Sequence, residues 1–277
     1  MHGNPAISVK ILTVMLRKNL EWRYPDLRAP YWRFYWNFAG EAQISLPDRR
    51  IALRPQTGYL IAPETRFSGR GERLDHFYVH FTLPEEVRLR DGAVYAVPGS
   101  RELAALVADL AERVECSPKR QREDRALPSA HSIGAAGSVA AAGLVLSALA
   151  RIPLEAGTVP VTDPLVRAAV QAISGDPGRF VRSDQIAHQA GCDERTLRRR
   201  FAAAMQTTPL QFALRRRIEH SCMLLHFTER SIEEIAEQTG FCDRHHFSKV
   251  FRTHRGIGPA GFRAISDQLP HQTARSQ

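Results

Sequence analysis

The residues with the clearest chemistry in this 277-residue chain are hydrogen-bond donors that recur in two short segments about 50 residues apart. Each segment repeats large apolar residues four positions apart, which predicts a helix with one polar face. Guanidinium, imidazole, hydroxyl and ammonium groups match the phosphates and base edges of DNA. The candidate DNA-contacting residues are Glu194, Arg195, Thr196, Arg198 and Arg199 in the first segment, and Arg244, His245, Ser248 and Lys249 in the second.

Other arginines near these segments have more than one interpretation. The run from Arg198 to Arg200 also fits a merely solvated helix face. Arg200, next to Phe201, fits either packing along apolar surface or contact with a phosphate. Arg215 to Arg217 fit a solvated face or a surface contact as well as they fit phosphate binding.

A duplicated sequence unit positions both segments. Self-similarity at a fixed period marks repeated structural units. Each copy predicts a helix, a glycine turn with left-handed backbone and a second helix, which together form a helix-turn-helix motif whose second helix enters a major groove. A small residue four positions before each glycine lets the helices touch. The first copy contains Ile186, Ala187, Gly191, Leu197, Phe201, Pro209 and Phe212, which recur 49 or 50 residues later as Ile235, Ala236, Gly240, Phe247, Phe251, Pro259 and Phe262.

A single long helix is predicted to join the two copies. Pro209 favours the first helical position, and the pattern continues to Phe227. These 19 residues span about 28 Å at ~1.5 Å per residue, which suits successive major grooves ~34 Å apart. One chain would thus read two groove segments. The predicted N-cap residues of the C-terminal helices are Ser183, Asp193, Thr208, Ser231 and Asp243.

The front half of the chain has a different pattern. Short apolar and aromatic runs separated by Pro and Gly between residues 31 and 98 predict a β-sandwich or barrel. Helical spacing follows at residues 101–115, and a second helix is expected at about 133–151. The predicted organisation is an N-terminal domain at 1–152, a linker at 153–163 without periodicity, and an all-helical domain of about seven helices at 164–277.

Composition favours a polyanionic partner. The formal net charge is +9, with 34 Arg against 4 Lys. Residues from Pro164 onward carry 17 Lys and Arg against 11 Asp and Glu, so the basic excess is denser in the duplicated region. Arginine forks suit phosphates and guanine edges. A base-composition bias in the genome explains the arginine excess equally well.

Cysteine usage and hydropathy favour a cytoplasmic protein. The four cysteines are widely spaced, which excludes a typical zinc motif, and Cys192 and Cys242 are expected as reduced, partly buried thiols. Lys10 and Arg17-Lys18 interrupt any signal peptide. The uncharged stretch 129–150 is rich in Ala, Gly and Ser, so we expect a closely packed helix there and no membrane span.

The duplicated region resembles the AraC/XylS family of bacterial transcription regulators. The match runs from Pro164 to Ile265, and its most specific part is the run of Ser231, Ile235, Ala236, Gly240, Phe241, Asp243, Phe247 and Phe251 at the family spacing. The chain departs from the family where Gln206 replaces a common Gly. It also departs where Phe212 and Phe262 replace common Tyr residues.

The front half resembles the family's sensor domain more weakly, through Leu53, Pro55, Gly58 and Pro63 and the strand that ends at Phe81. The resemblance implies a cupin-like β-barrel followed by two dimerisation-type helices. It implies effector contacts by His76 and Tyr78, with Arg66 on the preceding loop. His76, Tyr78 and His80 would share one strand face. A metal bound by His76 and His80 is an alternative, but no third ligand stands nearby, so we expect no metal and no cofactor.

The fold class expected is therefore a two-domain α+β protein with a cupin-like barrel and two helix-turn-helix motifs. The expected function is that of a non-enzymatic transcription regulator, more an activator than a repressor, that answers a small effector. Sugars are favoured over aromatic acids and amino-acid derivatives. The resemblance implies promoter DNA, RNA polymerase and a second copy of the chain as partners. A cupin-type metal-dependent enzyme with a DNA-binding domain is the alternative, followed by an architectural or repair protein.

Overall fold

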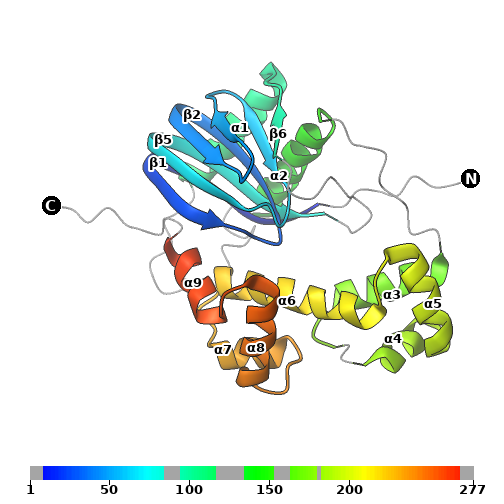
Figure 1. Ribbon diagram of the computed structural model, residues 1–277. Helices are drawn as coiled ribbons and strands as arrows, with labels where there is room; N and C mark the ends of the chain where they lie inside the picture. Colours follow the sequence, from blue (N-terminus) through cyan, green and yellow to red (C-terminus); the bar gives the residue numbers. More distant parts are fainter. Residues whose placement is uncertain (1–8, 84–93, 117–133, 153–162, 180–181, 269–277) are drawn as a thin grey trace, which may run out of the picture. The chain divides into compact units, whose positions relative to one another are not determined.

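The computed structural model describes residues 9–83, 94–116, 134–152, 163–179 and 182–268 (Figure 1). The chain divides into two compact units. In the described residues, the first unit holds six strands and two helices, and the second holds seven helices. This confirms a two-domain α+β protein. Residues 153–162 of the expected linker lie outside the described residues.

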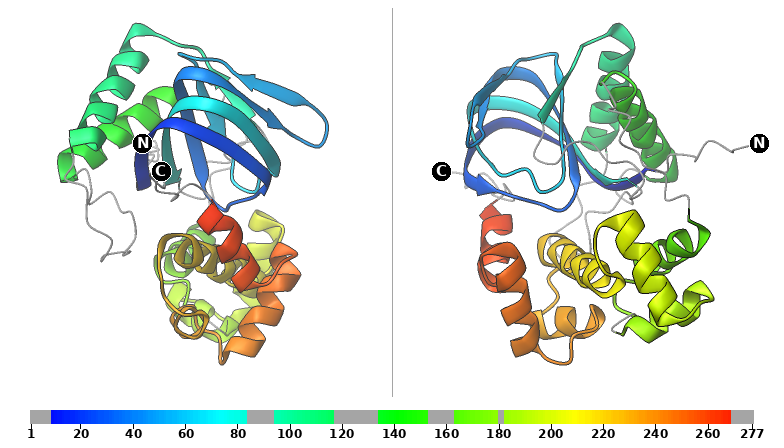
Figure 2. Two further views of the ribbon diagram at one scale, coloured as in Figure 1. Left: turned by 90° about the vertical axis from the view of Figure 1, so that its left-hand side faces the viewer. Right: turned by 45° about the vertical axis from the view of Figure 1, so that its right-hand side comes forward.

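The first unit is built on an antiparallel sheet. Its described strands run in the order β1-β5-β2-β4-β6, and β3 also pairs with β2. Long strands at the centre hold most of the pairing, and the sheet is visibly curved (Figure 2). The bounds are β1 Lys10–Leu27, β2 Trp32–Ser45, β3 Arg50–Leu53, β4 Gly58–Ile61, β5 Phe67–Thr82 and β6 Val94–Val97.

Two features of this sheet differ from the sequence-based expectation. The strand β1 (Lys10–Leu27) was not expected, because its residues alternate poorly and its register with β5 is interrupted by irregularities. The expected cupin-like barrel is not confirmed. Within the described residues, β1 and β6 end an open path of strands and do not pair with each other.

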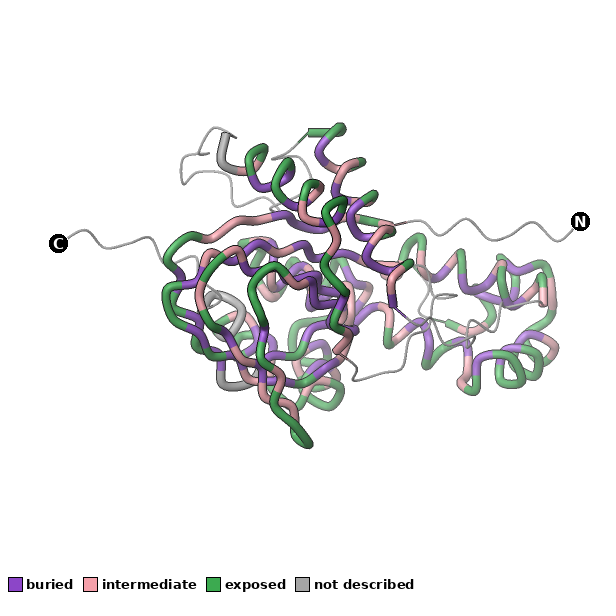
Figure 3. The backbone as a smooth tube through the Cα atoms, turned by 90° about the horizontal axis from the view of Figure 1, so that it is seen from above, coloured by how far each residue is buried: buried purple, intermediate pink, exposed green. Residues whose placement is uncertain are grey.

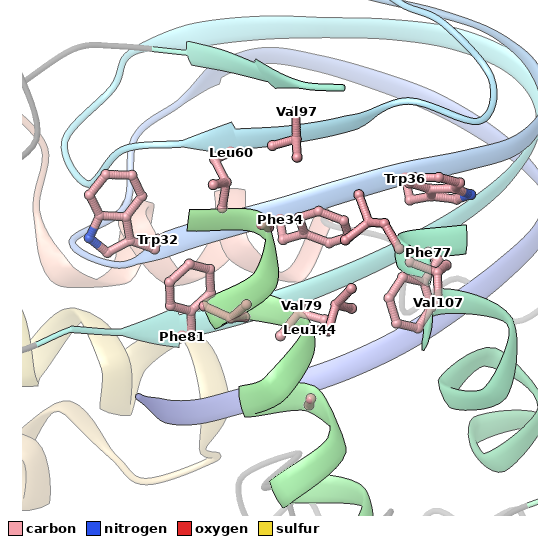
Figure 4. Packing of buried hydrophobic residues seen from close by; sticks show 14 of the residues in the cluster. Trp32, Phe34, Trp36, Leu60, Phe77, Val79, Phe81, Val97, Val107 and Leu144 are labelled. Carbon is pink, nitrogen blue, oxygen red and sulfur yellow. The ribbon is translucent and has the colours of Figure 1, made fainter. Parts of the chain in front are cut away.

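Alternation along the strands gives the sheet two distinct faces. Phe34 and Trp36 on β2, with Phe77 and Val79 on β5, point toward the helices α1 (Arg101–Cys116) and α2 (Gly134–Leu149) (Figure 4). Both helices lie on this side of the sheet (Figure 2). Odd and even residues of a strand point to opposite faces, so the intervening residues of β2 and β5 form a second, more polar face.

The described part of the uncharged stretch forms the packed helix α2, as expected, and residues 129–133 lie outside the described residues. Ala141, Leu144, Val145 and Ala148 are fully buried, in the same core as Leu103 and Val107 of α1. The small side chains of α2 let its backbone approach α1 closely, because they project only a short distance from the helix axis. No helix in the described parts of the chain is both long enough and apolar enough to cross a bilayer.

The second unit consists of helices with one buried side each, visible as alternating buried and exposed colours along the tube (Figure 3). One end of α6 contributes Phe212 and Ala213 to a core with α3, α4 and α5, and the other end contributes Ile218 and Leu225 to a core with α7, α8 and α9. The bounds are α3 Pro164–Gly175, α4 Ser183–Ala190, α5 Glu194–Met205, α6 Pro209–Phe227, α7 Ile232–Gln238, α8 Arg244–Arg255 and α9 Pro259–Gln268.

Helix starts follow the predicted caps with one correction. Asp193, Thr208, Ser231 and Asp243 each accept a hydrogen bond from the backbone N–H of the third residue of their helices. The prediction for Ser183 was wrong, since Ser183 is already helical and Arg182 is the N-cap residue of α4. The Gln185 side chain accepts from the Arg182 N–H at 3.2 Å, so a glutamine replaces the expected serine contact.

Candidate nucleic-acid interface

The first helix-turn-helix motif comprises α4, the turn at Gly191 and α5. Gly191 has φ 74° and ψ 33°, the left-handed conformation that the sequence predicts. The Cys192 N–H donates to the Ala187 carbonyl at 3.1 Å and closes the turn. Ala187 is buried, so its small side chain lets the two helices meet.

The second motif repeats this geometry with a tighter turn. Gly240 has φ 73°, and the Phe241 N–H donates to the Ala236 carbonyl at 2.9 Å. A methyl group on Gly240 would overlap the carbonyl oxygen of Gly178, which precedes α4, whereas the space around Gly191 is open. Gly240 is therefore required both by its backbone angle and by a contact with the loop of the first repeat.

The second helix of each motif has a buried face and an exposed polar face. Leu197 and Phe201 of α5, and Phe247 and Phe251 of α8, are completely buried. The predicted contact residues lie on the opposite side. Glu194, Arg195, Arg198, Arg199, Arg244, His245 and Lys249 are exposed, and Thr196 and Ser248 are half-buried.

Most positively charged side chains on these two faces have no partner within the described part of the protein. The side chains of Arg195, Arg198, Arg199, Arg244 and Lys249 make no hydrogen bond or ion pair with any residue that the structure describes. Arg200 differs, because its Nη1 lies 3.4 Å from the Asp163 carboxylate that caps α3. The structure therefore assigns Arg200 an intramolecular partner and leaves its neighbours available to an external one.

The two capping aspartates fix where the polar faces begin. Asp193 accepts from the Thr196 N–H at 2.9 Å, and Asp243 accepts from the His246 N–H at 2.7 Å. A hydrogen bond from the Thr196 side chain, together with the Thr196 N–H, holds the pKa of the Asp193 carboxyl group below the ordinary value, and the His246 N–H does the same for Asp243. Cys242, expected to be partly buried, is exposed. Its thiol donates to Asp243, and this contact raises the thiol pKa.

Sequence reasoning missed the role of Arg217. Its side chain is buried on α6, and its guanidinium donates to the carbonyl oxygens of Thr239 (2.6 Å) and Gly240. The same group lies 3.9 Å from the centre of the Phe241 ring. Burial lowers the pKa of Arg217. Arg217 thus braces the second turn. Its neighbours Arg215 and Arg216 pair with Glu219 instead.

The candidate effector residues of the first unit are only partly brought together. His76, Tyr78 and His80 share the second sheet face, as expected. The His76 and Tyr78 ring centres are 5.6 Å apart, and those of Tyr78 and His80 are 4.8 Å apart. Arg66 is exposed in the loop before β5, and no described contact joins it to His76 or Tyr78.

His76 is a fixed, neutral donor. The Asn37 amide nitrogen donates to the Leu53 carbonyl at 3.3 Å, so the Asn37 oxygen must accept, and His76 Nδ1–H donates to it at 2.7 Å. Burial lowers the pKa of His76 to about 3. Because Nδ1 is committed to Asn37, only Nε2 remains as an acceptor. The described residues contain no group of three or more side chains with metal-ligand geometry.

Known proteins show the same C-terminal pattern. A helix-turn-helix domain family model matches residues 186–265, which contain both motifs. The chain is 31% identical over 128 residues to the HTH-type transcriptional activator RhaR of Salmonella schwarzengrund, covering 46% of this chain and 45% of that one. Residues 186–265 therefore form a helix-turn-helix domain similar to those of AraC-type transcription regulators. It spans about half the length of the curated relatives it matches.

Several solved structures are also similar to this chain. The DNA-binding domain of the global transcriptional factor AdpA, in complex with a target DNA, is 28% identical and covers 40% of this chain and 100% of that one, with a TM-score of 0.37. ToxT of Vibrio cholerae is 15% identical and covers 96% of this chain and 100% of that one, with a TM-score of 0.48. Of these proteins, RhaR is named a transcriptional activator and AdpA a global transcriptional factor.

Three further side chains of the second sheet face could have been found from strand alternation in the sequence. Arg33, Tyr35 and Asn37 occupy every second position of β2, opposite His80, Tyr78 and His76 on β5. The surrounding aromatic run hid this pattern, since apolar residues occupy both faces there. Arg17 of β1 reaches the same face, where it donates to Tyr78.

Proposed function

We propose that this chain is a sequence-specific double-stranded-DNA-binding transcription regulator that acts as an activator at promoter sites. The observation that carries the proposal is the pair of exposed donor faces on α5 and α8. The side chains of Arg195, Arg198, Arg199 and Arg244 on these faces have no partner among the described residues. An uncommitted guanidinium on a recognition helix fits the O6 and N7 atoms of guanine with two parallel hydrogen bonds.

Each face combines base readers with phosphate contacts. Arg198 and Arg244 are our candidates for base edges, because they are exposed on the side opposite the buried phenylalanines. The remaining predicted residues, Glu194, Arg195, Thr196, Arg199, His245, Ser248 and Lys249, supply further base and phosphate contacts. The 19 residues of α6 separate the two faces so that they address successive major grooves.

The first unit supplies control in this proposal. Residues 1–152 bind a small effector on a cupin-like sheet and form a homodimer through α1 and α2. Residues 153–163 link this unit to residues 164–277, which bind DNA. His76, Tyr78 and the loop residue Arg66 are the proposed effector contacts, with sugars as the starting class. The matched relatives are named activators, which supports activation through RNA polymerase.

The test is base discrimination by single variants. Binding sites are first selected from random duplex DNA with the wild-type chain. Arg198→Ala and Arg244→Ala should each weaken binding to the selected site by about 1–3 kcal/mol and relax the base preference at one position. Binding is measured by fluorescence anisotropy at fixed salt, because phosphate contacts make affinity salt-dependent.

Arg216→Ala is the matched control, since Arg216 is held by Glu219 at 2.7 Å away from both faces. It should leave the selected-site affinity unchanged. Equal losses on selected and random DNA for Arg198→Ala and Arg244→Ala would show that these residues do not read bases.

A further inference from the structure

The second sheet face contains a buried cation with no counter-charge. Arg33 on β2 is 3% exposed. Its Nη1 is buried without a hydrogen-bond partner, and among the described residues the guanidinium forms no ion pair. Its protein contacts are aromatic, since its central carbon lies 5.5 Å from the Tyr31 ring centre and 5.2 Å from that of Phe67.

Such an arrangement is energetically unfavourable unless something completes it. An arginine stays protonated in a protein, so burial cannot neutralise it. Buried charges are normally paired with an opposite charge, because removal from water costs more than ring contacts return. The structure thus holds a desolvated guanidinium, oriented by two rings, whose hydrogen-bonding groups are unused.

The surroundings of Arg33 add positive charge and aromatic surface but no acid. The neighbours on this face are, by strand, Thr13, Met15 and Arg17 of β1, His80, Tyr78 and His76 of β5, Ile61 and Tyr59 of β4, and Tyr35 and Asn37 of β2. None of these is Asp or Glu. Tyr35 cannot serve as the anion at neutral pH, because burial raises its pKa to about 12.

We propose that Arg33 binds the carboxylate of a small organic acid with an apolar, ring-sized body. This inference rests on the proposed function, since it places the acid at the effector site of that proposal. A carboxylate matches the planar fork of a guanidinium. The rings of Tyr31, Phe67, Tyr35 and Tyr78 suit an apolar body. A neutral sugar would leave the charge uncompensated, so the acid class replaces sugars as the preferred effector.

The first part of the experiment uses the full chain without ligand. Trp22, Trp32 and Trp36 are the only tryptophans and all lie in the first unit, so tryptophan fluorescence follows the unfolding of that unit. Arg33→Met should raise its Tm by about 2–4 °C, because the variant removes an uncompensated charge from the interior. The matched control Arg70→Met, at an exposed position of β5, should leave the Tm unchanged.

The second part adds probes to the wild-type chain. Benzoate, phenylacetate and decanoate are compared with benzyl alcohol, phenethyl alcohol and decanol, and with glucose and inorganic phosphate. At least one acid should raise the Tm by several degrees while its alcohol does not, since a ligand that binds only the folded state stabilises it. Arg33→Met should lose this response, and Arg70→Met should keep it.

Four outcomes would overturn the inference. They are a Tm decrease in Arg33→Met, equal responses to every acid and its alcohol, stabilisation by phosphate equal to that by the acids, or stabilisation by glucose alone. The wild-type probes decide the question even if Arg33→Met does not fold. DNA affinity is measured in parallel. Retained site-specific DNA binding together with a failed acid response would reject the ligand class and leave the proposed regulator standing.

Discussion

His76 shows how one residue can make the first unit sensitive to pH. Its ring stacks on Trp22 at 5.5 Å, lies 4.8 Å from Tyr35, and donates to Asn37. Protonation would place a second charge beside Arg17, its cross-strand partner on β1. Burial of the ring lowers the His76 pKa from the ordinary 6.5 to about 3, so the site holds the neutral ring.

This pKa predicts the direction of an acid effect. Between pH 6.5 and 3 the unfolded chain binds a proton at His76 that the folded chain excludes, so folding stability falls as the pH falls through this range. The slope from this group approaches about 1.4 kcal/mol per pH unit. His76→Gln retains a side-chain donor without a titration and should flatten the dependence. Urea unfolding at pH 7, 6 and 5, followed by tryptophan fluorescence, measures it. Parallel profiles for the two proteins would show that His76 does not titrate on unfolding.

The residue scale also shows where sequence reasoning ends. The shared face of His76, Tyr78 and His80 follows from strand alternation and was predicted correctly. The unpaired state of Arg33 was not predictable, because it depends on which side chains β5 and the loop to Phe67 bring beside it. The Arg217 contacts with the carbonyls of residues 239 and 240 were missed for the same reason, since they join α6 to a turn 22 residues away.

At the scale of elements, the two glycine turns form a natural comparison. Gly191 and Gly240 have the same left-handed φ, 74° and 73°, but only Gly240 presses on the Gly178 backbone. Gly191→Ala should cost about 1–2 kcal/mol, the penalty for a left-handed alanine. Gly240→Ala should lower the free energy of unfolding by about 1–3 kcal/mol more than Gly191→Ala, because the added methyl group overlaps the backbone carbonyl of Gly178, which can move only with its loop.

Far-UV circular dichroism during urea unfolding measures this difference, because the second unit holds most of the helical residues described. Gly143→Ala, at an open position inside α2 of the first unit, is the control for a general effect of adding a methyl group. Equal costs at Gly191 and Gly240 would mean that the loop containing Gly178 does not press on the second turn.

Helix positions were the most predictable elements. The 3.6-residue pattern, the capping residues and Pro209 gave α5 to α8 to within a residue, since these signals are local. The Ser183 cap was misplaced because Arg182 and Gln185 supply an alternative contact. The strand β1 was missed because its stability comes from pairing with β5, more than 40 residues later, rather than from its own pattern.

At the scale of the whole molecule, the central claim is that the second unit reads two groove segments with one chain. Each half of α6 belongs to a different small core, so α6 is the element that holds the two motifs together. The fragment used to test this should begin at Asp163 rather than Pro164. The Asp163 carboxylate accepts from the Leu165 N–H at 2.9 Å and pairs with Arg200.

The most direct test is hydroxyl-radical footprinting of the 163–277 fragment, as a monomer, on its selected DNA site, with the full chain in parallel. We predict two protected segments on one face of the duplex, centred about 10 base pairs apart. Inserting 5 base pairs between them should abolish protection of one segment, because α6 cannot rotate α8 around the helix. A single protected segment, or two segments that tolerate the insertion, would contradict the account.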